Sequence, residues 1–136
     1  MKKLLFIPFL FACLLSMGQA SDSAAIIGKS IKFQNLVVAE SSFPKQMNWA
    51  DAKKACARLG AGWRLPTKDE LNLLYENKGQ IGHLGYWRFW SSTESRTETN
   101  GILAFEQDFS EGSKYSGHQY HDEKSAKYSV RAVRDF

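Results

Sequence analysis

The sequence has 136 residues, of which 43% are hydrophobic and 24% are charged, and its formal net charge is +4. Removal of an N-terminal segment that holds Lys2 and Lys3 lowers the net charge to about +2, which is too little to indicate binding to nucleic acid or to a bulk membrane surface. The remaining ~116 residues suffice for one hydrophobic core, so we expect a single domain.

The first twenty residues have the pattern of a secretory signal peptide. Two lysines precede an apolar run from Leu4 to Leu15, and Gly18 and Ala20 supply small side chains at the expected cleavage site. We therefore expect residues 1–20 to be removed and the mature protein to be exported to the periplasm or the extracellular space. In the alternative, Cys13 becomes the lipidated N-terminus of a membrane-anchored lipoprotein. No later apolar run is long enough to span a bilayer.

Residues 21–30 are small and polar and predict a flexible leader, whereas residues 31–39 are rich in apolar and β-branched side chains and predict a first strand. Asn48 has the chemistry of an N-cap for a helix over residues 49–59. Cys56 lies on the apolar face of that helix, so we expect a small buried side chain rather than a reactive thiol. It is the only cysteine after the signal peptide, and the mature chain can form no internal disulfide.

The segment WRLPTKDEL carries the strongest local signal in the chain. Pro66 disfavours helix at the preceding residue, Thr67 can cap a new helix, and Glu70 can bond back to the Thr67 amide. Apolar side chains then recur at helical spacing, which predicts a helix over residues 68–78 with Gly79 as its left-handed stop.

Beyond this helix the pattern changes to glycines interleaved with aromatic residues. Residues 91–100 are polar and show neither helical nor strand periodicity, so they predict a loop. Trp87 and Trp90 are too large and apolar to remain in water, and we expect at least one of them to fill the core beneath the loops.

The last third of the chain is predicted to contain two strands separated by a turn and a loop. Residues 101–109 alternate, which predicts a half-buried strand with Glu106 and Asp108 facing solvent. Residues 110–112 predict a hairpin turn, and residues 128–136 predict a final strand that can pair with the first one. Because the helices are segregated in sequence from most strands, the fold class is α+β.

Four sequence blocks, in this order, resemble the Lcl C-terminal-like domains of bacterial exported proteins: NWADAKKAC, GWRLPTKDEL, WSST and VRAVRDF. That family belongs to the C-type lectin-like superfamily, which also includes the formylglycine-generating enzymes. The resemblance implies that residues 31–136 form a C-type lectin-like domain. Two helices would flank a small twisted antiparallel sheet, the N- and C-terminal strands would pair, and long loops would form the ligand face.

The resemblance also bears on individual residues of these blocks. Many similar proteins carry a cysteine in the final block that can pair with the cysteine of the first helix, but this chain has Ala132 there. The arginines of the blocks, Arg64, Arg131 and Arg134, are expected to form internal ion pairs, such as Arg64 with Glu70, rather than to bind a ligand.

We expect no enzyme activity, no catalytic residue and no cofactor. The formylglycine-generating enzymes use a pair of downstream cysteines, and this sequence has none after Cys56. No Ser-His-Asp motif, phosphate-binding loop or dinucleotide fingerprint is visible. An enzyme with an unrecognised site is the weakest hypothesis, because a fold alone does not fix a function.

Two groups of residues have the composition of a metal site without its spacing. Glu106, Asp108 and Glu111 offer oxygen atoms, but the calcium-loop motifs of sugar-binding C-type lectins are absent. His118 and His121 lie beside two carboxylates, yet no predicted helix brings their rings to one face for zinc. We therefore expect no metal.

The segment around Tyr115 and Tyr120 predicts a contact surface, because tyrosines combine flat apolar area with a hydroxyl group and lose few rotamers on binding. Nearby lysines, including Lys127, indicate an anionic partner. The expected ligand-binding residues are Arg88, Lys114, Tyr115, His118, Tyr120, His121 and Lys124.

The sequence thus predicts an exported, non-catalytic ligand-binding or adhesion module whose aromatic and basic loops meet a polysaccharide or a surface protein. The choice of ligand rests on the family resemblance, since such relatives act in adhesion and in binding of glycosaminoglycan-like chains. The alternative is a structural or assembly subunit of a cell-envelope complex, in which the same loops contact a protein partner or another copy of the chain.

Overall fold

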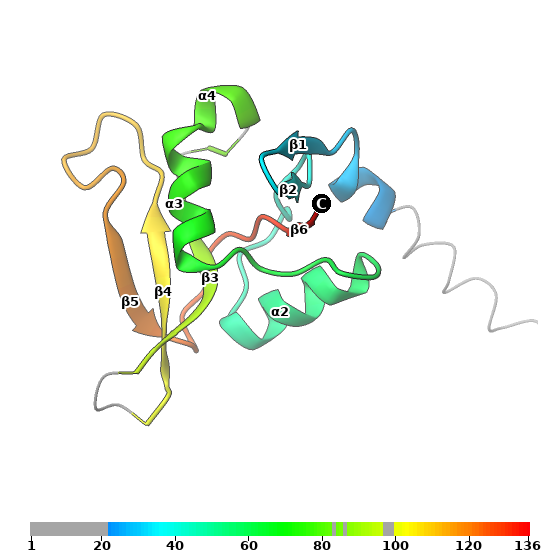
Figure 1. Cartoon of the computed structure of the whole chain (residues 1–136). Helices are drawn as coiled ribbons and strands as arrows, with labels where there is room; N and C mark the ends of the chain where they lie inside the picture. The colour runs from blue at the N-terminus through cyan, green and yellow to red at the C-terminus, as the bar shows by residue number, and fades with distance from the viewer. Residues whose placement is uncertain (1–21, 83, 86, 97–99) are drawn as a thin grey trace, which may run out of the picture.

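The computed structural model describes residues 22–82, 84, 85, 87–96 and 100–136, so the expected signal peptide and Cys13 lie outside the described residues. Two three-stranded antiparallel sheets, β1-β2-β6 and β3-β4-β5, lie on opposite sides of the molecule (Figure 1). The elements are β1 (Ile31–Phe33), β2 (Leu36–Val38), α2 (Trp49–Arg58), α3 (Lys68–Glu76), α4 (Lys78–Ile81), β3 (Arg88–Ser95), β4 (Leu103–Asp108), β5 (Gln119–Glu123) and β6 (Val133–Asp135).

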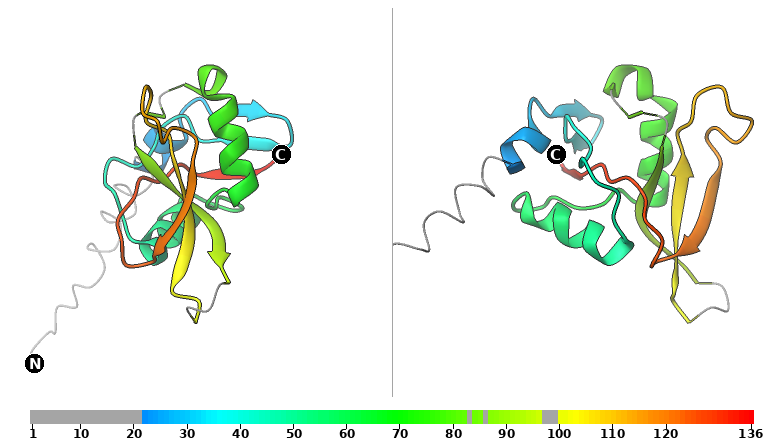
Figure 2. Two further views of the ribbon diagram at one scale, coloured as in Figure 1. Left: turned by 90° about the vertical axis from the view of Figure 1, so that its left-hand side faces the viewer. Right: turned by 180° about the vertical axis from the view of Figure 1, so that it is seen from behind.

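The first sheet brings the two ends of the domain together, as predicted. β2 pairs antiparallel with β1 on one side and with β6 on the other, and Figure 2 shows the C-terminus beside the β1–β2 hairpin in both views. The single strand expected over residues 31–39 is instead this hairpin, which turns at Gln34 with a φ of +54°.

Residues 22–27 are helical, although the sequence indicated a flexible leader over residues 21–30. The difference has a clear cause, because Ile26 is buried and packs in the main core. In the part of the chain that the structure describes, no helix is long and apolar enough to cross a bilayer.

The helix predicted over residues 49–59 is α2. Its N-cap is Asn48, whose side-chain oxygen accepts the Asp51 amide hydrogen at 2.9 Å. Cys56 is fully buried on the inner face of α2, as expected, and burial raises the pKa of its thiol to about 12. A thiol with that pKa stays protonated and unreactive at neutral pH.

The capping box predicted for the second helix is confirmed in α3. The Glu70 amide donates to the Thr67 hydroxyl, and the Glu70 carboxylate accepts the Thr67 amide hydrogen at 2.8 Å. The Lys68 amide, a further unpaired donor of the first turn, donates to the Thr93 hydroxyl of β3 at 2.9 Å. The N-terminus of α3 is thereby fixed to the second sheet.

The predicted stop at Gly79 was wrong. Gly79 is helical within α4, and the chain leaves the helix at Gly82, which has a φ of +66°. The extra turn buries Ile81 against the core under α3, so packing carries the helix past the first available glycine.

The loop predicted for residues 91–100 was wrong over residues 91–95, which belong to β3. The Ser91 hydroxyl donates to a carbonyl of β4 at 2.8 Å, so the strand accommodates this polar side chain. The register between β3 and β4 also shifts between Trp90 and Glu94. Such a bulge interrupts the alternation on which strand prediction relies.

The connection between β4 and β5 runs through residues 109–118 and is longer than the turn predicted for residues 110–112. β6 is likewise shorter than the strand predicted over residues 128–136, because the chain before it forms only isolated bridges. The fold class is confirmed, with two small sheets in place of one.

Two apolar clusters form the core. The first packs α2 against the first sheet and includes the fully buried Trp90, which confirms that a tryptophan fills the core. The second lies under α3, where Phe109 makes edge contacts with Phe89 and Tyr75 at centroid distances of 5.0 and 5.3 Å. α3 therefore covers one face of β3-β4-β5 and leaves the opposite face for other side chains.

The arginines of the family blocks are structural. Arg64 pairs with Glu70 at 2.7 Å, as predicted, and also with Asp135 of β6 at 2.7 Å. The guanidinium of Arg134 lies over the Trp63 ring at 5.4 Å. Arg131 is fully buried and donates to the Ser42 hydroxyl at 3.1 Å, and burial lowers its pKa to about 10.

Candidate functional site

The face of β3-β4-β5 that points away from α3 carries Arg88 and Tyr120, two of the seven residues that the sequence predicted to bind a ligand. Strand register places Arg88 opposite Asp108 and Glu106 opposite Tyr120. Because side chains alternate along a strand, these four project from the same face. The neighbouring Trp90, also opposite Glu106, closes one end of this face with its buried ring.

Arg88 is bound to this face by two carboxylates. Its Nη1 atom lies 3.2 Å from Glu106 Oε1, and its Nε atom lies 3.5 Å from Asp108 Oδ2. The guanidinium also stacks on the Tyr120 ring at 4.8 Å from the centroid. The charge of Arg88 is thus largely satisfied within the fold.

Glu106 and Asp108 were predicted to face solvent, and this prediction was wrong. Glu106 is 1% exposed and Asp108 is 5% exposed. Burial raises the pKa of Glu106 to about 7, even though the charge of Arg88 acts to lower it. Its Oε2 atom accepts no hydrogen bond from any residue that the structure describes. Burial therefore favours the protonated, uncharged form of this carboxyl group.

Three further contacts extend this arrangement from Tyr120 into a line that we call the tyrosine–histidine row. The Tyr120 hydroxyl lies 3.3 Å from His118 Nδ1, and the His118 ring meets the edge of the Tyr115 ring at a centroid distance of 6.2 Å. The Lys114 ammonium then lies over the Tyr115 ring at 4.9 Å. The row consists of Arg88, Tyr120, His118, Tyr115 and Lys114, and Tyr115 is 45% exposed.

The loop that carries the row is anchored to α3. Gly117 has a φ of +82°, and a Cβ atom there would lie 2.6 Å from the Tyr75 ring. Next to it, the Ser116 hydroxyl shares a 2.7 Å hydrogen bond with the Tyr75 hydroxyl. The Gly117 amide also donates to the Asp108 carbonyl at 2.8 Å. Only glycine allows this close approach without strain.

Two of the seven predicted site residues do not join the row. His121 points to the opposite face of β5, where its Nδ1 atom lies 2.9 Å from the Ser95 hydroxyl. Lys124 lies past the end of β5, pairs with Glu94 at 3.2 Å and covers the Trp49 ring at 4.3 Å. Alternation along the strand separates His121 from its neighbour Tyr120.

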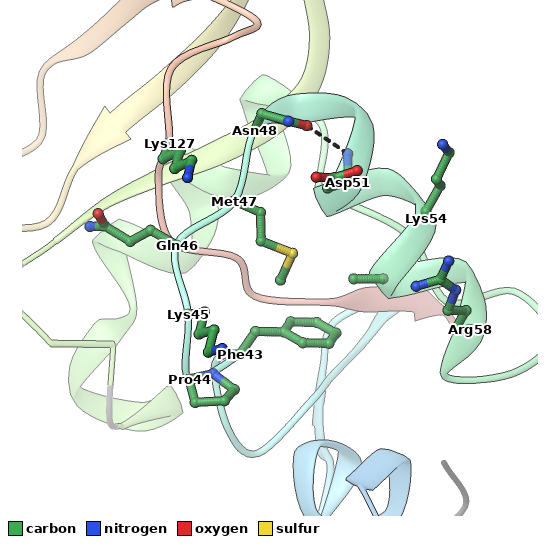
Figure 3. Close-up of a pocket in the computed structure, with 11 residues that line it drawn as sticks. Phe43, Pro44, Lys45, Gln46, Met47, Asn48, Asp51, Lys54, Arg58 and Lys127 are labelled. Atoms are coloured by element: carbon green, nitrogen blue, oxygen red, sulfur yellow. Dashed lines mark hydrogen bonds between the residues drawn. The ribbon is translucent and has the colours of Figure 1, made fainter. Parts of the chain in front are cut away.

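A second candidate region was not predicted from the sequence. A cavity of about 530 Å³ lies between α2 and residues 43–48, and we call it the basic groove (Figure 3). Its cationic side chains are Lys45, Lys54, Arg58 and Lys127. Lys54 and Arg58 are four residues apart on the solvent face of α2, a spacing visible in sequence. The other two come from separate segments, so only the fold brings the four together.

The family described as the Lcl C-terminal domain matches residues 32–134. No curated protein shows significant sequence similarity to the chain.

Solved structures share the fold at low sequence identity. Botrocetin aligns with a TM-score of 0.57 and 11% identity, over 79% of this chain and 96% of its own. EMS16, described as an antagonist of collagen receptor integrin alpha2beta1, aligns with a TM-score of 0.57 and 10% identity, over 79% and 97%. A chain of the complex between the von Willebrand factor A1 domain and botrocetin aligns with a TM-score of 0.53 and 13% identity. The alignment covers 80% of this chain and 98% of that one.

These similarities agree with the paired terminal strands, the two helices and the small antiparallel sheets described above. The family match covers well over half of the chain. The protein therefore belongs to the Lcl C-terminal domain family and has the C-type lectin-like fold.

Proposed function

We propose that this chain is an exported, non-catalytic binding module that presents the tyrosine–histidine row to a polysaccharide. The observation that carries the proposal is the continuous line of rings from Tyr120 through His118 to Tyr115 on a loop anchored to α3. Flat rings with polar edges can stack on sugar rings while their hydroxyl and imidazole groups bond to sugar hydroxyls.

The rigidity of the loop supports the proposal further. Gly117, Ser116 and the Asp108 carbonyl fix the backbone before any ligand arrives, so little conformational entropy is lost on binding. Non-catalytic function is supported by the fold comparisons, since the similar structures include an antagonist of a receptor and a complex between two proteins.

Export is part of the proposal. It rests on the signal-peptide pattern of residues 1–20 and on the resemblance of this chain to domains of bacterial exported proteins. Cell fractionation with detection of the mature N-terminus tests it. A cytoplasmic protein that still begins at Met1 would contradict export, and a lipid-modified Cys13 would replace a free mature protein with an anchored one.

Binding is tested by screening the purified protein against an array of neutral and acidic polysaccharides, followed by calorimetry on those that bind. Tyr115→Ala removes the most exposed ring of the row and is expected to weaken binding about tenfold. Phe136→Ala is the matched control, because Phe136 is also an exposed ring but lies at the C-terminus, outside the row. No binding by any array member, or equal affinity of wild type and Tyr115→Ala, would remove the row as a polysaccharide site.

A contact with another protein or with a second copy is the second candidate function. Trp87 is 60% exposed and borders a cavity of about 390 Å³ that Leu84 and Phe89 also line. Exposed tryptophan beside a partly apolar cavity is typical of protein interfaces. Sedimentation velocity at increasing protein concentration tests self-association, and Trp87→Ala is expected to abolish any dimer that forms.

A further inference from the structure

The basic groove has an apolar floor and a cationic rim. Phe43 and Met47 line the space between α2 and the 43–48 segment, while Lys54 and Arg58 extend from α2 and Lys127 from the segment that leads to β6 (Figure 3). This combination differs from a plain cluster of surface lysines, since a ligand in the groove meets charge and apolar area together.

The cations of the rim have no partner among the residues that the structure describes. Lys45, Lys54, Arg58 and Lys127 form no ion pair with a described carboxylate, whereas Arg64, Arg88 and Lys124 elsewhere each have one within 4.0 Å. Among the described residues that line the groove, Asp51 is the one with an acidic side chain. It lies in the first turn of α2, where the helix dipole favours an anion, so the rim keeps an excess of positive charge.

The apolar surface continues beyond the groove. A second cavity, also of about 530 Å³, shares Phe43, Pro44, Ala55 and Arg58 with the first and adds Ile26 and Leu59. Arg58 therefore stands between two apolar stretches. A ligand that follows this surface places apolar groups on both sides of a guanidinium.

These features select the chemistry of the occupant. A sulfated or uronic polysaccharide supplies anions but no aliphatic side chains for the floor, and an apolar peptide leaves the cations unpaired. An acidic peptide with interspersed apolar residues supplies both, and its carboxylates can form charge-assisted hydrogen bonds with Lys54 and Arg58.

We propose that the basic groove binds an acidic, partly apolar peptide segment of a partner protein, at a site separate from the tyrosine–histidine row. Phe43 and Met47 receive apolar side chains of that segment, and the four cations receive its carboxylates. A module that holds a polysaccharide on one surface and a protein segment on another would join the two.

The test uses a short fluorescein-labelled peptide of alternating glutamate and leucine and measures its fluorescence anisotropy with the protein purified after export. The peptide is expected to bind, and its affinity is expected to fall as the salt concentration rises because exposed charges are screened. Lys54→Glu and Lys127→Glu are each expected to weaken binding about tenfold, although they lie on different segments.

Lys53→Glu is the matched control, because it reverses one charge on the same helix at a residue whose ammonium lies over Trp49 outside the groove. Its affinity for the peptide is expected to stay within about twofold of wild type. Equal weakening by Lys53→Glu and Lys54→Glu would overturn the site, since only the overall charge would then matter.

A second peptide carries serine in place of every leucine and keeps the same charge. It is expected to bind at least about tenfold more weakly, since burial of even part of two leucine side chains contributes that much. Equal affinity of the two peptides would overturn the peptide assignment in favour of a general anion site, as would failure of the leucine peptide to bind at all. Tyr115→Ala leaves peptide binding unchanged, so failure here is distinguishable from failure of the polysaccharide proposal.

Discussion

The tyrosine–histidine row and the basic groove both contain cations, but the two regions use them differently. In the row, Arg88 is held by Glu106 and Asp108 and stacks on Tyr120. In the groove, Lys54 and Arg58 have no carboxylate partner among the described residues. The charge of Arg88 stabilises the fold, while the charges of Lys54 and Arg58 are available to a ligand. The number of basic residues in a segment therefore says little about anion binding until their partners are known.

The difference originates in secondary structure. Cross-strand pairing in β3-β4-β5 forces Arg88 beside carboxylates on the next strand, because facing residues lie at a fixed spacing. The groove has no such pairing, since its rim comes from the outer face of α2 and from two irregular segments. The following predictions test how far this contrast holds.

The largest expected effect is a dependence of stability on pH that arises from Glu106. Its pKa is about 7 in the folded protein and 4.5 as its ordinary value, so the unfolded chain loses this proton at lower pH than the folded protein. The contribution of Glu106 to stability is therefore fully present below pH 4.5 and is lost as the pH rises through about 7. The free energy of unfolding is expected to fall by up to about 3 kcal/mol over this range.

Urea denaturation followed by tryptophan fluorescence at several pH values measures this change. Glu106→Gln removes the titration while keeping the shape of the side chain, and the variant is expected to lose most of the dependence between pH 4.5 and 7. A slope that persists in Glu106→Gln would assign the effect to another group.

The next largest effect is expected from Arg88→Ala. Without the guanidinium, Glu106 and Asp108 lose their shared positive partner, and the free energy of unfolding at pH 8 is expected to fall by roughly 2 to 3 kcal/mol, less than for a fully buried pair because Arg88 is partly exposed. At pH 5, where Glu106 is protonated, the loss is expected to be smaller. Equal losses at both pH values would show that Arg88 acts by packing alone.

Gly117→Ala tests the anchoring of the row to α3. The added methyl group combines a positive φ with a clash against Tyr75, and the expected loss of unfolding free energy is about 2 kcal/mol. Gly112→Ala is the control, because Gly112 has a similar φ of +73° with no atom within 4 Å of the added Cβ. It is expected to cost about 1 kcal/mol, since only backbone strain remains. Equal losses would mean that the contact with Tyr75 adds nothing.

The smallest effect is expected in the groove. Lys54→Ala removes an exposed cation that has no described partner, so the free energy of unfolding is expected to change by less than about 0.5 kcal/mol. The same denaturation measurement checks it against Arg88→Ala. If Lys54→Ala lowered the free energy of unfolding as much as Arg88→Ala, the charges of the two regions would not differ in their contribution to stability.

Local sequence determined where the two main helices begin and which of their side chains are buried. The N-cap at Asn48 and the capping box of Thr67 and Glu70 form between residues three apart, so their chemistry is complete within a few residues of chain. The burial of Cys56 and the pairing of the first and last strands were also predictable, the former from helical periodicity and the latter from the family blocks. Of the predicted site residues, those from Lys114 to Tyr120 lie together in the row, and their binding of a ligand stays a prediction.

Tertiary structure decided the rest, because the deciding contacts join residues far apart in the sequence. β3 was missed because a bulge breaks its alternation and a partner strand satisfies its polar side chains. Glu106 looked solvent-exposed by alternation, yet β5 and Trp90 enclose it. The basic groove is formed by α2, residues 43–48 and Lys127. These segments are far apart in the sequence, so no local sequence pattern predicts that they meet. Periodicity specifies which side of a helix or strand is apolar. Only tertiary packing decides which other element contacts the apolar side and which contacts the polar side.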